Sequence, residues 1–129
     1  MASPRPVLGR ILVVDDDCSL RTLLHNYLAR CGYAVTVCPS AEEALRLVAA
    51  EEFRLLIADL TLPRISGEEL VRRACEADPQ LRALLLSGYP FDLSVLPEQW
   101  RARVRFLQKP FLPEELSASI RALLEDRAG

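Results

Sequence analysis

Hydrophobic residues are concentrated in five short, mainly apolar runs. A run of this length that is bounded by polar or turn residues is typical of a strand buried on both faces. Most runs are followed by a longer stretch in which apolar residues recur every three or four positions, the spacing of a helix that covers a sheet. We therefore predict strands at residues 11–14, 33–37, 55–58, 84–86 and 104–107.

Local signals mark where several helices begin and end. Ser40 and Ser66 each stand three residues before a Glu, the spacing of a capping box, and Asp17 is expected to cap the first helix. Gly32 sits where a left-handed residue would end that helix. Segment 90–97 begins and ends with proline, so any helix there should be short or irregular. The apolar stripes of the first and last helices comprise Leu20, Leu23, Leu24, Tyr27, Leu28, Cys31, Leu112, Leu116, Ile120, Leu123 and Leu124.

Five strand-helix units with short connections predict a parallel sheet, because parallel strands are joined by helical crossovers. We expect an α/β domain with a doubly wound five-stranded parallel sheet between two helix layers. In such sheets, ligands bind beyond the carboxyl ends of the strands. The candidate functional residues are those at which the apolar runs stop: Asp15, Asp16, Asp59, Ser87 and Lys109.

The composition narrows the class of protein. The chain has 129 residues, half of them hydrophobic, which suits one globular domain. Its 16 basic and 18 acidic residues give a net charge of -2, so no overall positive field favours nucleic acid. No apolar run approaches the roughly 20 residues of a membrane span, and the N-terminus does not resemble a signal peptide. We expect a cytoplasmic protein that binds neither nucleic acid nor membrane.

The cysteines and the single histidine match none of the common metal or redox motifs. Cys18, Cys31, Cys38 and Cys75 form no C-x-x-C pair, so their spacing predicts neither a zinc site nor a thiol-disulfide centre. In a reducing compartment we expect free thiols that behave as small apolar side chains. His25 lies in the first predicted helix, where we expect a structural role.

The strand-end residues form a set with definite chemistry. Asp15, Asp16 and Asp59 would repel one another at one rim of the sheet, which calls for a cation among them. Mg²⁺ prefers oxygen ligands and is commonly held by one or two carboxylates. Lys109 supplies a second positive charge and Ser87 a hydroxyl donor. The set suits phosphoryl transfer with Asp59 as the nucleophile, although each residue alone is typical of a cap, a turn or a surface charge.

Four strings carry a more specific signal. In order and spacing, ILVVDDD, LLIADLTLP followed by SG, LLLSGYP and FLQKPF resemble the receiver domain of bacterial two-component response regulators. The resemblance implies a flavodoxin-like (βα)5 fold with strand order 2-1-3-4-5. It extends over residues 9–127, with residues 1–8 as an N-terminal extension and residues 128–129 as a C-terminal tail.

The resemblance also implies roles at the metal end of the site. Asp59 corresponds to the phosphoacceptor. Asp15 and Asp16 correspond to ligands of Mg²⁺, direct or through water, together with Asp59 itself and the backbone carbonyl of Thr61. Mn²⁺ is expected to be able to replace Mg²⁺.

Further positions match the residues that contact the phosphoryl group and the aromatic residue that moves in response to it. Ser87 corresponds to the hydroxyl residue that hydrogen-bonds this group, and Lys109 to the lysine that pairs with it. Phe106 corresponds to the aromatic residue that moves inward when the hydroxyl residue approaches the phosphate. The Lys109–Pro110 bond is expected to be cis. Ser and Phe stand where Thr and Tyr are frequent, and Leu62 where Met is usual, which leaves the details of the output surface open.

The implied function is that of a phosphoacceptor signalling domain in a phosphorelay. A histidine kinase or histidine phosphotransfer domain would supply the phosphoryl group, and the chain would catalyse its own phosphorylation and dephosphorylation without being a dedicated enzyme. A downstream protein would bind through residues 88–127, and the domain would be a monomer or a weak dimer. Because no output domain follows the last predicted helix, we expect a stand-alone regulator or a domain excised from a larger protein such as a hybrid histidine kinase. The cognate kinase, the signal and the target are not encoded in these motifs.

Other interpretations make different demands on the sequence. A phosphatase with an aspartate nucleophile would need a second Asp where the chain has Thr61. A nucleotide-binding module is disfavoured, because neither G-x-G-x-x-G nor G-x-x-x-x-G-K-[ST] follows any predicted strand. A degenerate receiver that acts as a phosphorylation-independent scaffold stays open, although the acidic residues and Lys109 argue against it. For Arg101, Arg103 and Arg105, we favour protection of an edge strand over a partner patch.

Overall fold

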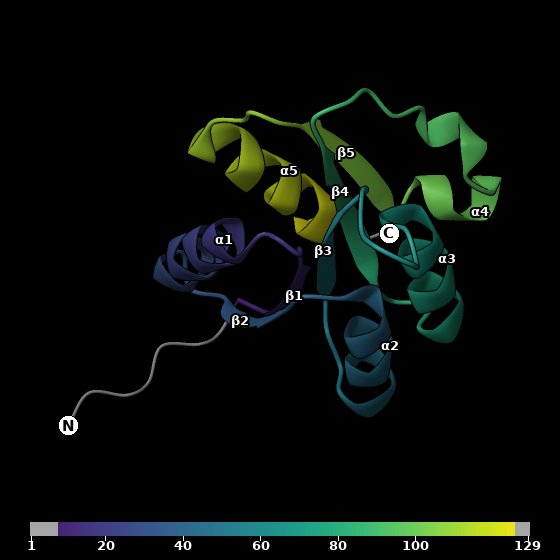
Figure 1. Ribbon diagram of the computed structural model, residues 1–129, viewed down its shortest axis with the longest axis horizontal. Coiled ribbons are helices and arrows are strands. Elements are labelled where there is room, and N and C mark those ends of the chain that lie inside the picture. The colour runs from purple at the N-terminus through teal and green to yellow at the C-terminus, as the bar shows by residue number, and fades with distance from the viewer. Residues whose placement is uncertain (1–7, 126–129) are drawn as a thin grey trace.

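The central element is a five-stranded parallel sheet with helices on both faces (Figure 1). The computed structural model describes residues 8–125. The strands lie in the order β2-β1-β3-β4-β5, and every neighbouring pair is parallel. This topology confirms the predicted doubly wound, flavodoxin-like fold. The strands are β1 (Arg10–Val14), β2 (Ala34–Cys38), β3 (Leu55–Asp59), β4 (Arg82–Ser87) and β5 (Val104–Gln108).

The helices form the two outer layers. Those on one face of the sheet are α1 (Cys18–Arg30) and α5 (Pro113–Glu125), and those on the other are α2 (Ala41–Ala50) and α3 (Gly67–Ala77) (Figure 1). Between β4 and β5 the chain forms only a 3-10 turn, η1 (Leu93–Val95), and a four-residue helix, α4 (Glu98–Arg101). The expected irregularity of this segment is therefore confirmed.

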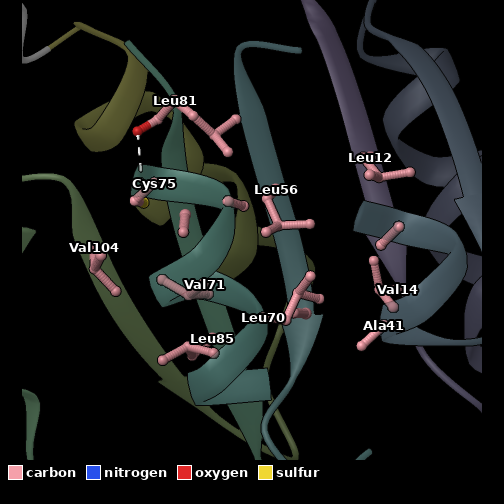
Figure 2. Packing of buried hydrophobic residues seen from close by; sticks show 14 of the residues in the cluster. Leu12, Val14, Ala41, Leu56, Leu70, Val71, Cys75, Leu81, Leu85 and Val104 are labelled. Carbon is pink, nitrogen blue, oxygen red and sulfur yellow. Dashed lines mark hydrogen bonds between the residues drawn. The ribbon is translucent and has the colours of Figure 1, made fainter. Parts of the chain in front are cut away.

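Each strand contributes alternate residues to two separate cores. Leu12 and Leu56 face α2 and α3, and Figure 2 shows them in the same layer as Leu70 of α3. Ile11 and Ile57 face α1 and α5. Because successive side chains of a strand point to opposite faces, both positions are buried, which explains why the strand runs are apolar without alternation. Burial of each such side chain is worth about 1.5–3 kcal/mol relative to exposure.

Side-chain caps set the starts of three helices. Asp17 Oδ1 accepts hydrogen bonds from the backbone N–H groups of Ser19 (2.9 Å) and Leu20 (3.3 Å) at the start of α1. The hydroxyls of Ser40 and Ser66 accept the N–H groups three residues later, at 3.2 and 3.1 Å. Gly32 has a φ of 105° just after α1, as predicted for its terminating residue. These caps fix where α1, α2 and α3 begin, close to the strand ends that matter below.

The prediction that two leucines belong to the buried helix stripes is wrong. Leu23 is 64% exposed and Leu112 is 62% exposed. Leu23 precedes the buried Leu24, and a step of one residue around a helix turns the side chain by about 100°, so the two face different directions. Leu112 precedes the first residue of α5 and therefore lies outside the stripe that this helix buries.

The arginines around β5 correct another expectation. Arg103 donates from three nitrogens to the carbonyls of Leu81 (2.9 Å), Cys75 (3.4 Å) and Asp78 (2.5 Å). Arg101 donates to two carbonyls of the segment just before α4. Both arginines therefore hold backbone together rather than protecting an edge. Arg105 is exposed on β5, which is an edge strand of the sheet.

The cysteines differ in burial. Cys38 and Cys75 are buried, Cys31 is half-buried and Cys18 is exposed, and all four are free thiols. Burial raises the pKa of Cys38 to about 11 and also raises the pKa of Cys75, so both buried thiols are neutral at physiological pH. Among residues 8–125, no helix combines the length and the apolar character that crossing a membrane requires.

Candidate functional site

Four neighbouring strand ends bring the predicted site residues together. Asp15 follows β1, Asp59 ends β3, Ser87 ends β4 and Lys109 follows β5. The backbone ladder continues past these ends, since Leu60 N–H donates to Leu86 O and Lys109 N–H donates to Ser87 O, both at 2.7 Å. The residues therefore lie along one edge of the sheet, as the parallel topology requires.

An acidic cluster (Asp15, Asp16 and Asp59) forms at this edge. Each carboxylate offers an oxygen, and these oxygens all lie within 4.8 Å of one another. Asp15 is 1% exposed and Asp59 is 8% exposed, whereas Asp16 is exposed to solvent. Two of the three negative charges are thus largely withdrawn from water. Their mutual repulsion is stronger there than in solvent, because the protein interior screens charges less than water does.

Asp15 is only partly compensated by its neighbours. Its Oδ1 accepts the Asp17 N–H at 2.8 Å, while its buried Oδ2 has no hydrogen-bond partner among the described residues. Burial raises the pKa of Asp15, and the charges of Asp59 and Asp16 raise it further, although the Asp17 N–H and the Lys109 ammonium act against them. The cluster is therefore short of positive charge.

Lys109 is the cation of the site. Its Nζ lies 3.6 Å from Asp15 Oδ2 and 3.7 Å from Asp59 Oδ1. The ammonium pairs with two of the three carboxylates, so the acidic cluster and Lys109 together keep an excess of negative charge. A buried carboxylate oxygen that accepts no hydrogen bond, beside two further carboxylates, is the kind of donor set that a hard divalent cation such as Mg²⁺ uses, and the residues fit that group.

The remaining predicted residues surround Asp59 and the end of β4. Thr61 is exposed, and its N–H donates to Asp59 Oδ1 at 3.3 Å, which orients the carboxylate. Ser87 is buried, and its Oγ accepts the Tyr89 N–H at 2.9 Å. Phe106 on β5 is half-buried, with its ring centroid 6.1 Å from that of Phe91. The Lys109–Pro110 bond is cis, as expected.

Two residues to which the sequence analysis assigned no role support the backbone of the site. Gly67 opens α3, and its N–H donates to Leu60 O at 2.9 Å. A Cβ on Gly67 would lie 2.2 Å from Asp59 O and 2.8 Å from Leu60 Cα, so the helix reaches the Asp59 backbone only because this residue is glycine. Arg21 of α1 donates from Nη1 to Asp15 O at 2.7 Å. A glycine directly after a capping serine was the available signal for the first, and no local signal marked the second.

The comparisons with known proteins agree with this geometry. Residues 11–121 match the family described as response regulator receiver domain. The response regulator receiver protein CpdR of Brucella abortus (strain 2308) is 34% identical over 118 residues, which cover 91% of this chain and 98% of that protein. The DNA-binding transcriptional regulator NtrC of Rhizobium meliloti (strain 1021) is 33% identical over 118 residues, but this chain spans only 24% of its length.

The fold comparison gives the same family. The crystal structure of the response regulator protein TrrA from Thermotoga maritima, in complex with Mg²⁺-BeF, is similar with a TM-score of 0.80 and 32% sequence identity, covering 91% of this chain and 100% of that one. Receiver domains bind Mg²⁺ at an acidic pocket and interact with histidine kinases or phosphotransfer proteins and with downstream targets. The matched span, the topology and the strand-end residues together show that this chain belongs to the response regulator receiver domain family.

Proposed function

We propose that this receiver domain accepts a phosphoryl group on the carboxylate of Asp59 from a phosphohistidine of a histidine kinase or a phosphotransfer domain. The observation that carries the proposal is the juxtaposition of Asp59 with the buried Asp15 carboxylate and the Lys109 ammonium. The ammonium nitrogen lies 3.7 Å from Asp59 Oδ1 and 3.6 Å from Asp15 Oδ2. An ammonium shared by two carboxylates suits a reaction that adds further negative charge at the same place.

Asp15, Asp16, Asp59 and the backbone carbonyl of Thr61 would hold Mg²⁺, or Mn²⁺ in its place. The absence of a hydrogen bond to Asp15 Oδ2 among the described residues and the close approach of the three carboxylates support this ligand set. When bound, the cation supplies positive charge for the acidic cluster and for the oxygens of the transferring phosphoryl group. The complex of the similar TrrA with Mg²⁺-BeF supports the same choice of metal.

The chain's own residues then divide the work of transfer. A carboxylate oxygen of Asp59 attacks phosphorus, the phosphorus–nitrogen bond of the donor breaks, and its electron pair leaves with the imidazole. The product is an acyl phosphate, which water later hydrolyses. Thr61 N–H orients the attacking carboxylate, and the Lys109 ammonium beside Asp59 pairs with the added phosphoryl oxygens. Positioning and charge, rather than further covalent help, account for the rate.

The switch would use Ser87 and Phe106. In the structure Ser87 Oγ accepts a hydrogen bond from Tyr89 N–H. A phosphoryl group on Asp59 offers this hydroxyl an acceptor, and a rotation toward it makes space for the half-buried Phe106 ring. Phe106 packs against Phe91 of the irregular β4–β5 connection, so its movement alters the surface of residues 88–127 that we assign to a downstream protein.

Incubation of the full chain with acetyl phosphate, with and without Mg²⁺, tests the proposal. We expect a mass gain of one phosphoryl group that requires Mg²⁺, is absent in Asp59→Asn and persists in the control Asp17→Asn, in which Asn keeps the helix cap. A chain that never gains this mass, although it is folded and Mg²⁺ is present, would instead be a degenerate receiver. Turnover of diverse phosphomonoesters would indicate a phosphatase.

We also propose that the domain spans residues 9–127, that it is cytoplasmic, and that it is a monomer or a weak dimer. The family match covers residues 11–121, which lie inside the proposed bounds and support them. The proposed extension at residues 1–8 lies, except for Leu8, outside the described residues, as do residues 126–129 with the proposed tail. Light scattering after size-exclusion chromatography, with and without beryllofluoride, measures the oligomeric state.

A further inference from the structure

Two neighbouring acids of the acidic cluster are held in different ways. Asp15 is 1% exposed, and its Oδ1 accepts the Asp17 N–H at 2.8 Å. Its own backbone N–H donates to Cys38 O at 3.3 Å. Asp16 is exposed, and among residues 8–125 no group donates a hydrogen bond to its carboxylate. The place of Asp16 in the cluster therefore depends on its backbone.

The two peptide groups that flank Asp16 are both fixed by hydrogen bonds. The peptide before it carries the Asp15 carbonyl, which accepts a hydrogen bond from Arg21 Nη1 at 2.7 Å. The peptide after it carries the Asp17 N–H, which donates to Asp15 Oδ1. Because a peptide group is planar, two fixed planes set φ and ψ of the residue between them. One contact on each side thus sets the direction in which the Asp16 side chain leaves the backbone.

The start of α1 brings Arg21 to the Asp15 carbonyl. Arg21 N–H donates to Asp17 O at 3.0 Å, so Arg21 lies one turn into the helix that Asp17 caps. Side chains of a helix lean toward its N-terminus, and the long arginine side chain reaches back past the cap. Arg21 is half-buried, and no carboxylate of residues 8–125 forms an ion pair with it. Its guanidinium group therefore holds the backbone of the loop and does not neutralise a neighbouring acid.

The charge of Arg21 and its hydrogen bond have opposite effects on a bound cation. Burial raises the pKa of Cys38 to about 11 and the charge of Arg21 partly opposes this rise, so this charge acts on groups at the carboxyl edge. By Coulomb's law the same charge repels Mg²⁺. Water and salt screen a half-exposed charge, whereas the outer-shell partners of metal ligands typically contribute roughly 10–100-fold to metal affinity. The hydrogen bond should therefore outweigh the repulsion.

We propose that Arg21 is a positioning residue for the Mg²⁺ site. It fixes the peptide between Asp15 and Asp16, so that the exposed Asp16 carboxylate lies in the cluster before the cation arrives. This inference rests on the proposed binding of Mg²⁺ by the acidic cluster. A ligand that is already in place loses less conformational entropy on binding than a free one. Arg21 is not itself a ligand, because a guanidinium group has no acceptor to offer a cation.

Titration of the full chain with Mg²⁺, followed by the amide NMR shifts of residues 15–17, tests the proposal. Arg21→Met removes the charge and the donors but keeps most of the stem, and we expect the dissociation constant for Mg²⁺ to rise about tenfold. Repulsion alone predicts the reverse, a fall. Arg30→Met is the matched control, because it loses the same charge from the last turn of α1, about 13 Å along the helix, and should bind Mg²⁺ like the wild type. Arg21→Lys keeps the charge and a donor and should recover most of the affinity.

A double-mutant cycle identifies the residue through which Arg21 acts. Asp16→Asn weakens Mg²⁺ binding, and Arg21→Met should then weaken it less than about twofold further, because the ligand that it positions is gone. If Arg21→Met does not fold, Arg21→Gln, which is shorter than arginine by two atoms, replaces it in both experiments.

Three results would overturn the inference while leaving the proposed function intact. These are Mg²⁺ binding by Arg21→Met that equals or exceeds that of the wild type, additive effects of the two substitutions, and a variant that only loses stability in EDTA. The last result would show that Arg21 is merely structural. A wild type that binds no Mg²⁺ would overturn the proposed function, and the inference with it.

Discussion

The two edges of the central sheet handle charge in opposite ways. At the carboxyl edge, the buried carboxylates of Asp15 and Asp59 lie side by side, and Lys109 Nζ approaches them only to 3.6 and 3.7 Å. At the amino edge, Arg54 and Arg103 donate to five backbone carbonyls at 2.5–3.4 Å. The arginines of the amino edge are therefore hydrogen-bonded to backbone carbonyls. At the carboxyl edge, one ammonium lies beside two buried carboxylates, so negative charge is in excess.

The direction of the helices explains this division. In a strand-helix unit the helix begins at the carboxyl edge and ends at the amino edge, and a helix carries partial positive charge at its N-terminus and partial negative charge at its C-terminus. The starts of α1 and α3 therefore tolerate the acidic cluster. The ends of α3 and α5 present carbonyls, such as Cys75 O and Leu124 O, which Arg103 and Arg54 bind.

The largest effect should come from a methyl group at the carboxyl edge. In Gly67→Ala the new Cβ would lie 2.2 Å from Asp59 O, so either α3 or the Asp59 backbone must move. We expect a loss of about 3 kcal/mol in the free energy of unfolding, and loss of phosphorylation by acetyl phosphate even where the variant is folded. Urea denaturation and intact-mass spectrometry measure the two effects.

Gly88→Ala is the matched control for this variant. A Cβ on Gly88 meets no atom within 4 Å, so stability and phosphorylation should change little. If Gly67→Ala behaves like Gly88→Ala, α3 does not constrain Asp59, the proposed phosphoacceptor, and the carboxyl edge is more adaptable than its contacts suggest.

Removing a guanidinium group from the amino edge should have the next largest effect. Arg103→Ala leaves the carbonyls of Leu81, Cys75 and Asp78 without their donor, and we expect a loss of about 2 kcal/mol in the free energy of unfolding. Arg105→Ala removes an exposed charge from the same strand region and should cost less than about 0.5 kcal/mol. If urea denaturation gives the two variants equal losses in the free energy of unfolding, the structural role of Arg103 is contradicted. Edge protection would then be the better interpretation for both Arg103 and Arg105.

Neutralising a buried acid should have a smaller effect of the opposite sign. In EDTA, Asp15→Asn removes a charge that burial and two neighbouring carboxylates disfavour, and we expect a gain of about 1 kcal/mol in the free energy of unfolding. Because the pKa of Asp15 is raised in the folded state, its carboxylate costs stability at neutral pH, and the advantage of the variant shrinks as pH falls through that pKa.

Mg²⁺ separates this effect from a general change of charge. Added Mg²⁺ should raise the melting temperature of the wild type but not that of Asp15→Asn. Asp17→Asn loses one exposed charge while keeping its cap, so it should neither gain stability in EDTA nor lose the response to Mg²⁺. An Asp15→Asn variant that is less stable than the wild type in EDTA would show that the carboxyl edge is not strained by its charges.

The fold was predictable because its determinants are local. Residues 11–14 and 55–58 are apolar at every position, and both proved to be strands buried on both faces. The capping serines could be predicted because each one and its partner N–H group lie within one helical turn. The predicted burial of Leu23 and Leu112 was wrong, because hydrophobicity alone does not give the direction of a side chain. Leu23 is exposed on α1, and Leu112 lies just before the first residue of α5.

The candidate site was partly predictable for a topological reason. Parallel strands all end at one edge, so Asp15, Asp59 and Lys109 had to lie close together once the strands were assigned. The long-range contacts that support both edges were not predictable, although the glycine directly after the capping Ser66 was a visible signal. Arg103 reaches Cys75 across 28 positions of sequence, and Gly67 is needed only because α3 passes the backbone of Asp59. Such long-range contacts leave no periodic signal in the sequence.

Cysteine labelling gives the smallest but most local test of how rigid the two edges are. Burial and, to a smaller extent, the charge of Glu43 raise the pKa of Cys38, at the carboxyl end of β2, to about 11, so at pH 8 only about one thiol in a thousand is ionised. Arg103 opposes the effect of burial on Cys75, next to the amino edge. With iodoacetamide followed by peptide mass spectrometry, we expect the exposed Cys18 to react first, and Cys38 to stay unmodified until the pH is raised or the chain unfolds. Modification of Cys38 as fast as Cys18 at pH 8 would mean that β2 opens readily, and that the acidic edge is held by its loops rather than by the sheet.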